Sequence, residues 1–324
     1  MSEKYFITGA QGFIGAWIVK ALLERGDTPV IFDSSSDSRR LKAIIPEKWL
    51  DRAQFMLGDI TDADVVRRSV QESKANKIIH LAGVQVPACK ADPLLGAKIN
   101  VIGTLNVFQA AKTAGLERVV YASSAAVFGM SDDGRPLDES VRPEPGTHYG
   151  VFKHANEGNA RVYFLDHKLS SAGLRPYTVY GVGRDTGMTS DPTKAMKAAV
   201  LGRPFHIRFG GATDFQYVAD TAAAFIASAD RCQAGAHVFN LHGETIQVAT
   251  IVETIRRHLP MGSRELVTFG GPPIPIAPEL RDEAIRAAVG PLPSTPLSTG
   301  IRETIERFQQ LREEGRLDTS DLET

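Results

Sequence analysis

Tyr149 and Lys153 have the residue types and the spacing of a proton-transfer pair. They are four residues apart, so on a helix the phenol and the ammonium lie on one face. A phenol holds its proton near neutral pH, but a neighbouring positive charge stabilises phenolate and lowers the pKa of the hydroxyl. Such a phenol can take a proton from an alcohol or return one. The spacing is common on ordinary helices, so its meaning depends on the motifs upstream.

Ser123 and Ser124 end an apolar run at 118–123 that has the composition of a buried strand. In a doubly wound sheet, the carboxyl ends of parallel strands face the ligand crevice. A hydroxyl there can polarise the reacting oxygen of a substrate, and this is the function we predict for Ser124. The simpler interpretation is a serine pair that only terminates a strand.

A glycine-rich segment, Gly9-Ala10-Gln11-Gly12-Phe13-Ile14-Gly15, lies between the first strand-like run and the first helical segment. A pyrophosphate binds the open N–H groups and the positive end of a helix, and its close approach leaves no room for Cβ atoms. Glycine patterns alone are common in tight turns, but this placement inside a strand–helix–strand unit predicts a dinucleotide-binding loop.

Asp33 ends the second strand-like run, where a carboxylate can accept both ribose hydroxyls of an adenosine and repel a 2′-phosphate. NAD is therefore favoured over NADP, although Arg39 or Arg40 could reach such a phosphate. Asp59 could accept from the adenine amino group or cap the following helix. Leu81-Ala82-Gly83 supplies small residues beneath the expected pyrophosphate and nicotinamide ribose.

The elements that must position these residues alternate between strand and helix in the first half of the chain. This alternation predicts an α/β fold, with a doubly wound parallel sheet of the Rossmann type. A smaller α/β substrate lobe is expected to be interleaved in the C-terminal half. The expected strands are 4–8, 29–33, 54–58, 77–82, 118–123, 172–179, 205–209, 214–218 and 237–241, and the expected helices include 12–25, 94–114, 192–201, 219–230 and 299–313.

We assign residues 1–180 and 212–241 to the dinucleotide-binding domain and residues 181–211 and 242–312 to the substrate lobe. Residues 313–324 form a polar tail that is a candidate for disorder. The helix 94–114 is apolar on more than one side, so we expect it to pack against something besides the sheet.

The composition is that of an ordinary globular enzyme, with 43% hydrophobic and 23% charged residues in 324. A formal net charge of −1 favours neither nucleic acid nor a membrane surface as a partner. The two cysteines, Cys89 and Cys232, have no ligand spacing, so no metal site is predicted. Neither a signal peptide nor a membrane span is recognisable, and the cytoplasm is the expected location.

Taken together, these motifs resemble the extended short-chain dehydrogenase/reductase family, in particular its NAD-dependent epimerase/dehydratase branch. The resemblance runs from residue 4 to about residue 312. It is carried by TGAQGFIG (8–15), Asp33, GDITD (58–62), HLAG (80–83), Asn100, SSAAVFG (123–129), YGVFK (149–153) with Glu157, LRPYTVYG (174–181) and DFQYVAD (214–220).

The resemblance implies a role for each matching residue. Ser124 would contact the substrate hydroxyl, Tyr149 would be the acid/base, and Lys153 would lower the pKa of Tyr149. A small carbohydrate would be bound with help from Gln85, Arg184 and Arg208, and two copies of the chain would dimerise through helices at 94–114 and 149–168. NAD would be held by Gly9, Gln11, Gly12, Phe13, Ile14, Gly15, Asp33, Asp59, Ile60, Leu81, Ala82, Gly83, Asn100, Ser123, Tyr149, Lys153 and Tyr177.

Three departures from the family pattern bear on the reaction. Ala125 and Ala126 occupy the places of the acid and base of family dehydratases, which disfavours dehydration. Thr213 stands where sugar-nucleotide enzymes carry a diphosphate-binding arginine, and Arg208 or Arg184 would have to compensate. The region 181–194 also lacks the proline that usually follows the VYG motif.

The predicted reaction is NAD-dependent hydride transfer at a secondary alcohol of a sugar or sugar derivative. An epimerase acting on a sugar or sugar nucleotide is favoured. A sugar or uronate dehydrogenase is the alternative, because the diphosphate arginine is missing. A non-catalytic NAD-binding regulator is disfavoured by the intact set of Ser124, Tyr149 and Lys153.

Overall fold

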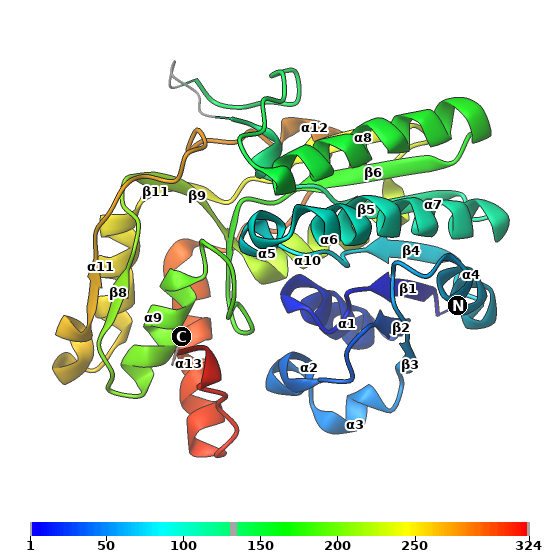
Figure 1. Cartoon of the computed structure of the whole chain (residues 1–324). Coiled ribbons are helices and arrows are strands. Elements are labelled where there is room, and N and C mark those ends of the chain that lie inside the picture. The colour runs from blue at the N-terminus through cyan, green and yellow to red at the C-terminus, as the bar shows by residue number, and fades with distance from the viewer. Residues whose placement is uncertain (1, 130–134, 323–324) are drawn as a thin grey trace.

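The computed structural model describes residues 2–129 and 135–322 of the chain. Seven parallel strands form one sheet, in the spatial order β10-β6-β5-β4-β1-β2-β3 (Figure 1). This order is that of a doubly wound Rossmann sheet, as predicted. The strands are β1 (Lys4–Thr8), β2 (Thr28–Asp33), β3 (Gln54–Leu57), β4 (Lys77–His80), β5 (Arg118–Ala122), β6 (Ser170–Arg175) and β10 (Ala236–Asn240).

Helices cover both faces of this sheet, because alternate strand residues point to opposite sides. From β1, Tyr5 and Ile7 enter the core beneath one face, and Phe6 enters the core of the other. The first face is covered by α1 (Phe13–Arg25) and α10 (Val218–Arg231), and the second by α4 (Ala63–Ser73), α7 (Gly103–Thr113) and α8 (His148–His167).

The first helix begins and ends as its sequence predicts. Gly12 is the N-cap of α1, and Gly26 ends it in a left-handed conformation with φ of 84°. The Gly26 N–H bonds the carbonyls of Leu22 and Leu23, as expected for a glycine that closes a helix. The glycine-rich loop after β1 therefore leads directly into α1, and the N-terminus of α1 lies next to the carboxyl end of β1.

The second part of the molecule is smaller and lies beside the carboxyl end of the large sheet (Figure 1). It contains a three-stranded sheet in the order β11-β9-β7 and a two-stranded sheet of β12 and β8. Its strands are β7 (Thr178–Tyr180), β8 (Phe205–Ile207), β9 (Ala212–Tyr217), β11 (Glu244–Gln247) and β12 (Val267–Phe269), and its helices are α9 (Asp191–Val200), α11 (Val248–His258) and α13 (Leu297–Glu313).

The predicted strand 172–179 is two strands in the structure. Pro176 separates β6 from β7, because proline has no N–H to continue a ladder. After this break, β7 pairs with β9 instead of the large sheet. The strands at residues 178–180 and 212–217 therefore pair within the small sheet, and the domain limits stay a prediction.

The predicted helix 94–114 is also divided. Asp92 caps α6 (Pro93–Ala97) by accepting from the Leu95 N–H, and a π-helical segment (Lys98–Ile102) connects α6 to α7. The remaining short helices are α2 (Arg39–Ile44), α3 (Glu47–Leu50), α5 (Val86–Ala91) and α12 (Glu283–Val289), and 3₁₀ turns lie at Ala125–Val127, Met261–Leu266 and Ser320–Leu322.

The polar tail, a candidate for disorder, makes two ion pairs with the rest of the chain in the structure. Asp318 pairs with Arg39 at 2.7 Å, and Asp321 pairs with Lys197 at 2.6 Å, so the tail contacts α2 and α9. These cations lie far from the tail in sequence, which explains why composition alone did not reveal the pairing. Within the described residues, no helix is both long and apolar enough to cross a membrane. The cytoplasmic location stays a prediction.

Candidate active site

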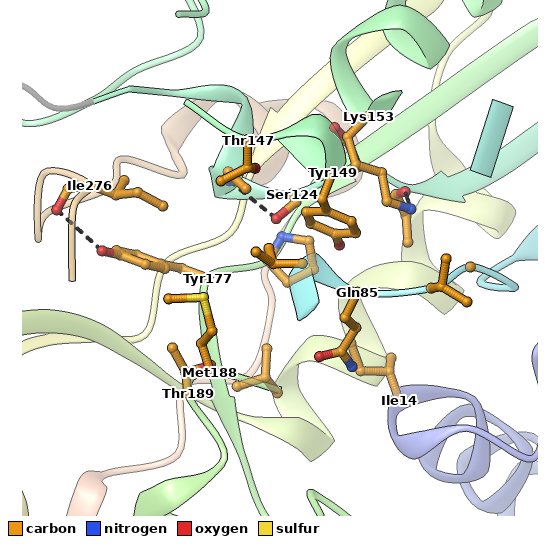
Figure 2. A pocket seen from close by; sticks show the side chains of 18 of the residues that line it. Ile14, Gln85, Ser124, Thr147, Tyr149, Lys153, Tyr177, Met188, Thr189 and Ile276 are labelled. Atoms are coloured by element: carbon orange, nitrogen blue, oxygen red, sulfur yellow. Dashed lines mark hydrogen bonds between the residues drawn. The ribbon is translucent and has the colours of Figure 1, made fainter. Parts of the chain in front are cut away.

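Three neighbouring cavities lie near the glycine-rich loop, and two of them are lined in part by the smaller part of the molecule. The central chamber, about 490 Å³, is shown in Figure 2. The Asp33 chamber, about 400 Å³, adjoins it and shares Gly9, Gly12, Leu81 and Gly83 as walls. The outer chamber, about 570 Å³, lies on its other side, with Lys194, Arg208 and Phe209 in its wall.

Nearly all the predicted site residues line the first two chambers. The central chamber is lined by Gly9, Gly12, Phe13, Ile14, Gly15, Leu81, Gly83, Gln85, Ser123, Ser124, Tyr149, Lys153, Tyr177 and Arg184. The Asp33 chamber is lined by Gly9, Gln11, Gly12, Asp33, Asp59, Ile60, Leu81, Ala82 and Gly83. Of the predicted residues, Asn100 and Arg208 line neither chamber.

The glycine-rich loop is packed so closely that side chains would collide. Gly9 has φ of +66°, and a Cβ there would lie 2.7 Å from the Ala82 backbone nitrogen. A Cβ on Gly15 would lie 2.4 Å from the Gly9 carbonyl oxygen. No side chain caps the N-terminus of α1. The first-turn N–H groups are therefore open to a pyrophosphate, as a dinucleotide requires.

Asp33 presents its carboxylate at the end of β2. One oxygen accepts from the Gln11 N–H at 3.0 Å, and the other accepts from the Ser35 N–H at 3.2 Å. Each oxygen keeps lone pairs for further donors, so both hydroxyls of an adenosine ribose can be accepted. The loop and this acid therefore fit NAD.

Arg39 and Arg40, the candidates for reading a 2′-phosphate, are both occupied. Arg39 pairs with Asp37 and Asp318, each at 2.7 Å. Arg40 pairs with Asp185 through Nε and Nη2, both at 2.9 Å. A 2′-phosphate would therefore have to compete with carboxylates already in place.

Asp59 does not cap the following helix, which was the alternative role considered for it. Asp62 caps α4 by accepting from the N–H groups of Asp64 and Val65, both at 3.0 Å. Asp59 accepts from the Thr61 N–H at 2.8 Å and lines the Asp33 chamber. Its position is thus compatible with a contact to the adenosine half of the cofactor.

Asn100 supports the site from behind. Its Oδ1 accepts from the Val84 N–H at 3.1 Å, and its Nδ2 donates to the Val84 carbonyl at 3.0 Å. A Cβ on Gly83 would lie 2.5 Å from the same Oδ1, so a side chain there would displace the Asn100 amide. The buried amide therefore fixes the chain after β4, which forms the wall between the chambers.

Ser124, Tyr149 and Lys153 meet in the central chamber (Figure 2). Lys153 is only 5% exposed, and its ammonium donates to the Ala122 carbonyl at 2.7 Å. The same ammonium lies 5.5 Å from the centre of the Tyr149 ring. Ser124 accepts from the Ala126 N–H at 3.1 Å, which leaves its hydroxyl hydrogen for another partner.

The start of α8 is seated against the turn that follows β5. Thr147 caps the helix by accepting from the Gly150 N–H at 3.1 Å. A Cβ on Gly150 would lie 2.1 Å from the Ala126 carbonyl oxygen. The backbones that carry Tyr149 and Ser124 are therefore in direct contact.

Burial raises the pKa of Tyr149, whereas a hydrogen bond with Ser124 and the charge of Arg184 lower it. The effect of Lys153 on this pKa stays a prediction. Burial disfavours the Lys153 ammonium and lowers its own pKa to about 8.

Ser123 differs from its neighbour. It is 2% exposed, and its hydroxyl donates to Glu157 at 2.6 Å. Glu157 is bonded in turn by Nε and Nη2 of the buried Arg175, both at 2.8 Å. Ser123 lines the chamber, but its hydroxyl is hydrogen-bonded to this ion pair. Only the other atoms of Ser123 are therefore available for a contact with the cofactor.

Two of the predicted substrate residues, Gln85 and Arg184, lie in the central chamber. Arg184 donates to the Thr189 hydroxyl at 3.0 Å, and its Nε is buried without a partner. Arg208 lies instead in the outer chamber and pairs with Asp191 through Nε at 2.9 Å and Nη2 at 2.7 Å. The Arg208 side chain is still 68% exposed, and its compensation for the missing arginine stays a prediction.

Several chamber residues had no signal in the sequence. Tyr177 bonds the Ile276 carbonyl at 3.2 Å, which brings segment 274–276 over the chamber (Figure 2). Met188 and Thr189 line the opposite side. The proline-rich composition around 271–278 indicated only a loop, and nothing in it predicted this contact.

The comparisons with known proteins agree with this geometry. The model of the NAD dependent epimerase/dehydratase family matches residues 5–242. The chain is 30% identical to UDP-glucose 4-epimerase of Mycolicibacterium smegmatis, covering 94% of this chain and 97% of that one. Among solved structures, it is similar to the UDP-glucose 4-epimerase of Thermus thermophilus in complex with NAD, with a TM-score of 0.80 and 25% identity over 94% of this chain and 99% of that one. It is also similar to MoeE5 in complex with UDP-glucuronic acid and NAD, with a TM-score of 0.78 and 26% identity over 95% and 99%.

The fold and the site define an NAD-dependent enzyme of the extended short-chain dehydrogenase/reductase type. The chain belongs to the NAD dependent epimerase/dehydratase family, and NAD is its cofactor.

Proposed function

We propose that this protein is a sugar-nucleotide epimerase that inverts one secondary carbinol by NAD-dependent oxidation and reduction. The observation that carries the proposal is the meeting of Ser124, Tyr149 and Lys153 in a chamber that adjoins the Asp33 chamber. Bound NAD supplies a hydride acceptor, which in an epimerase also returns the hydride to the opposite face of the same carbon.

The chain's own residues manage the proton of the reaction. As phenolate, Tyr149 takes the hydroxyl proton of the carbinol, and as phenol it gives a proton back when the carbonyl is reduced. Ser124 donates its free hydrogen to the reacting oxygen or to the Tyr149 oxygen and so holds the two in line. Lys153 is anchored to Ala122 and places positive charge beside the phenol and the expected nicotinamide ribose.

An epimerase needs room for the sugar ring to present its other face between the two hydride transfers. The walls contributed by Met188, Ile274 and Ile276 are apolar and offer few side-chain hydrogen bonds that would hold the ring in one orientation. Ala125 and Ala126 supply no acid or base for dehydration. These features support epimerisation within the family.

A sugar or uronate dehydrogenase is the second candidate. Thr213 replaces the diphosphate arginine of the family pattern and cannot substitute for it, because its buried hydroxyl lies 2.7 Å from that of Thr178. A substrate without a diphosphate would need no cation at this position. The two candidates therefore differ in whether the substrate is nucleotide-linked and whether NADH is released.

The deciding experiment is a substrate panel of UDP-hexoses, UDP-glucuronate, free aldoses and free uronates. NMR would follow the sugar, and the NADH absorbance band would be recorded in parallel. We expect interconversion of two UDP-sugars without net NADH. Stoichiometric NADH with a free sugar or uronate would establish the dehydrogenase instead. NAD binding without turnover of any compound would contradict both and favour the regulator.

We also propose that two copies associate through α6, α7 and α8. Helices α6 and α8 expose large apolar side chains, which for Leu94, Val162 and Leu165 are 84%, 48% and 57% exposed. Such a surface is typical of an interface between chains. Light scattering should give twice the chain mass for the native protein, and Leu165→Glu should give a larger monomer fraction.

A further inference from the structure

The side chain of Lys194 is largely buried, but its ammonium has no counter-charge. The residue lies on α9, is 6% exposed, and forms neither a hydrogen bond nor an ion pair with any described residue. Its Nζ lies 5.9 Å from the centre of the Phe205 ring. Nζ is not among the fully buried atoms that lack a partner, so the charged end of the side chain reaches the outer chamber that Lys194 lines.

A neighbouring lysine on the same helix shows the usual solution. Lys197 is also 6% exposed, but its ammonium pairs with Asp321 at 2.6 Å and donates to the Asp318 carbonyl at 3.1 Å. Lys194 has no such carboxylate. The ammonium of Lys194 is therefore available to a ligand that enters the outer chamber.

Lys194 lines the outer chamber, which shares Pro87, Met188, Thr189, Ile274 and Pro275 with the central chamber. A molecule whose reacting carbon lies at Tyr149 can therefore extend into this space. Asp185, the acidic residue in this wall, is engaged by Arg40. The chamber thus offers positive charge that the protein leaves unneutralised.

The other cation in this wall already has a counter-charge. Arg208 pairs with Asp191 through Nε and Nη2, although its side chain is 68% exposed, and Thr213 is turned inward to Thr178. Lys194 is therefore the cation in this wall whose charge no described carboxylate neutralises.

We propose that Lys194 binds the phosphate group that the substrate carries beyond its sugar ring, and so determines specificity for phosphorylated sugars. The inference rests on the proposed function, because it uses the same chamber system. The recognised chemistry is a phosphate oxyanion, either the diphosphate of a sugar nucleotide or the single phosphate of a sugar phosphate. In this role Lys194 is a specificity residue, remote from proton transfer.

The test is direct binding to the NAD-loaded protein, with UDP, inorganic pyrophosphate and galactose 1-phosphate as inert probes in calorimetry. We expect Lys194→Met to weaken UDP and pyrophosphate by roughly 10- to 100-fold, as for loss of a charged hydrogen bond. Lys194→Arg should restore most of this affinity. A preferential loss for UDP over galactose 1-phosphate identifies the diphosphate, and the reverse identifies the single phosphate.

Lys197→Met is the matched control, since it removes a buried ammonium of the same helix. It should lower thermal stability and leave UDP affinity within about twofold. Equal UDP binding by the wild type and a folded Lys194→Met would overturn the proposal. Because these probes bind without turnover, the result of the binding test does not depend on whether the protein is an epimerase.

Discussion

Arg40 and Asp185 form a two-point ion pair that joins α2 to the loop after β7, with both N–O distances at 2.9 Å. Arg40 also donates to the Gln11 carbonyl at 3.3 Å, within the glycine-rich loop. The pair therefore links the wall of the Asp33 chamber to the segment that carries Arg184 and Met188. It links the two parts of the molecule beside the chamber where the dinucleotide fits.

Breaking this pair should release NAD faster. With Asp185→Asn, we expect the NAD dissociation rate to rise roughly 3- to 10-fold, because one partly buried charge-assisted pair is lost. Stopped-flow displacement of bound NAD measures this rate. Arg302→Gln, which breaks the exposed pair with Glu306, is the control and should change nothing. An unchanged rate in Asp185→Asn would show that the link does not retain NAD.

Tyr149→Phe should abolish turnover and preserve the NAD-bound fold. Loss of a positioned acid/base costs about 10²- to 10⁴-fold in rate. The measurement is kcat with the substrate found in the panel, together with the NAD content of the purified protein. Tyr163→Phe, on the same helix but outside the chambers, serves as the control. Substantial activity in Tyr149→Phe would refute the acid/base assignment.

Substitution of the two adjacent serines should have different effects, one mainly on catalysis and the other mainly on stability. Ser124→Ala should lower kcat by about 10²-fold, because it removes the hydroxyl facing Tyr149. Ser123→Ala should lower kcat far less and destabilise the fold by about 1–2 kcal/mol, because it leaves the buried Glu157 short of a donor. Urea unfolding and steady-state kinetics on both variants decide the matter. Similar kinetic losses in both would contradict this division.

Lys153 should make the stability of the NAD-free protein depend on pH. Burial lowers its pKa to about 8 in the fold, below the ordinary value of 10.5. Between these values the unfolded chain binds more protons than the folded one, so the free energy of unfolding should rise with pH from 8 to 10.5. The difference between wild type and Lys153→Met in urea unfolding isolates this contribution. A difference that stays flat over that range would show that Lys153 titrates normally.

Asp33→Ala should weaken NAD and narrow the preference over NADP. The substitution removes the acceptor for the ribose hydroxyls and the charge that repels a 2′-phosphate. Titration of both cofactors by protein fluorescence gives the two dissociation constants. If the ratio of these constants stays the same, Arg39 or Arg40 determines the preference between NAD and NADP. That arginine would then have to leave its carboxylate partner to contact the cofactor.

Local sequence patterns were sufficient for the large sheet and for most of the chamber residues. The glycine loop, Asp33 and the Tyr149–Lys153 spacing depend on neighbours along the chain, so spacing alone indicates their geometry. The break at Pro176 was also present in the sequence, yet the apolar run around it masked the change of sheet.

The pairing of charged side chains could not be inferred in the same way. Arg208 with Asp191, Glu157 with Arg175 and Asp321 with Lys197 are brought together only by the folded chain. Lys194 was missed for the converse reason, because a lysine without a partner looks like any surface lysine until its burial is known.

The contact between Gly150 and the Ala126 carbonyl has a consequence for altering the substrate range of this enzyme. Because two main chains meet there, the backbone sets the distance between the Tyr149 and Ser124 hydroxyls. Substitution of nearby side chains should change this distance little. Libraries aimed at new sugars should therefore leave residues 147–153 intact. Variation belongs in Met188 and the 274–276 segment, whose side chains shape the chamber without carrying the reacting groups.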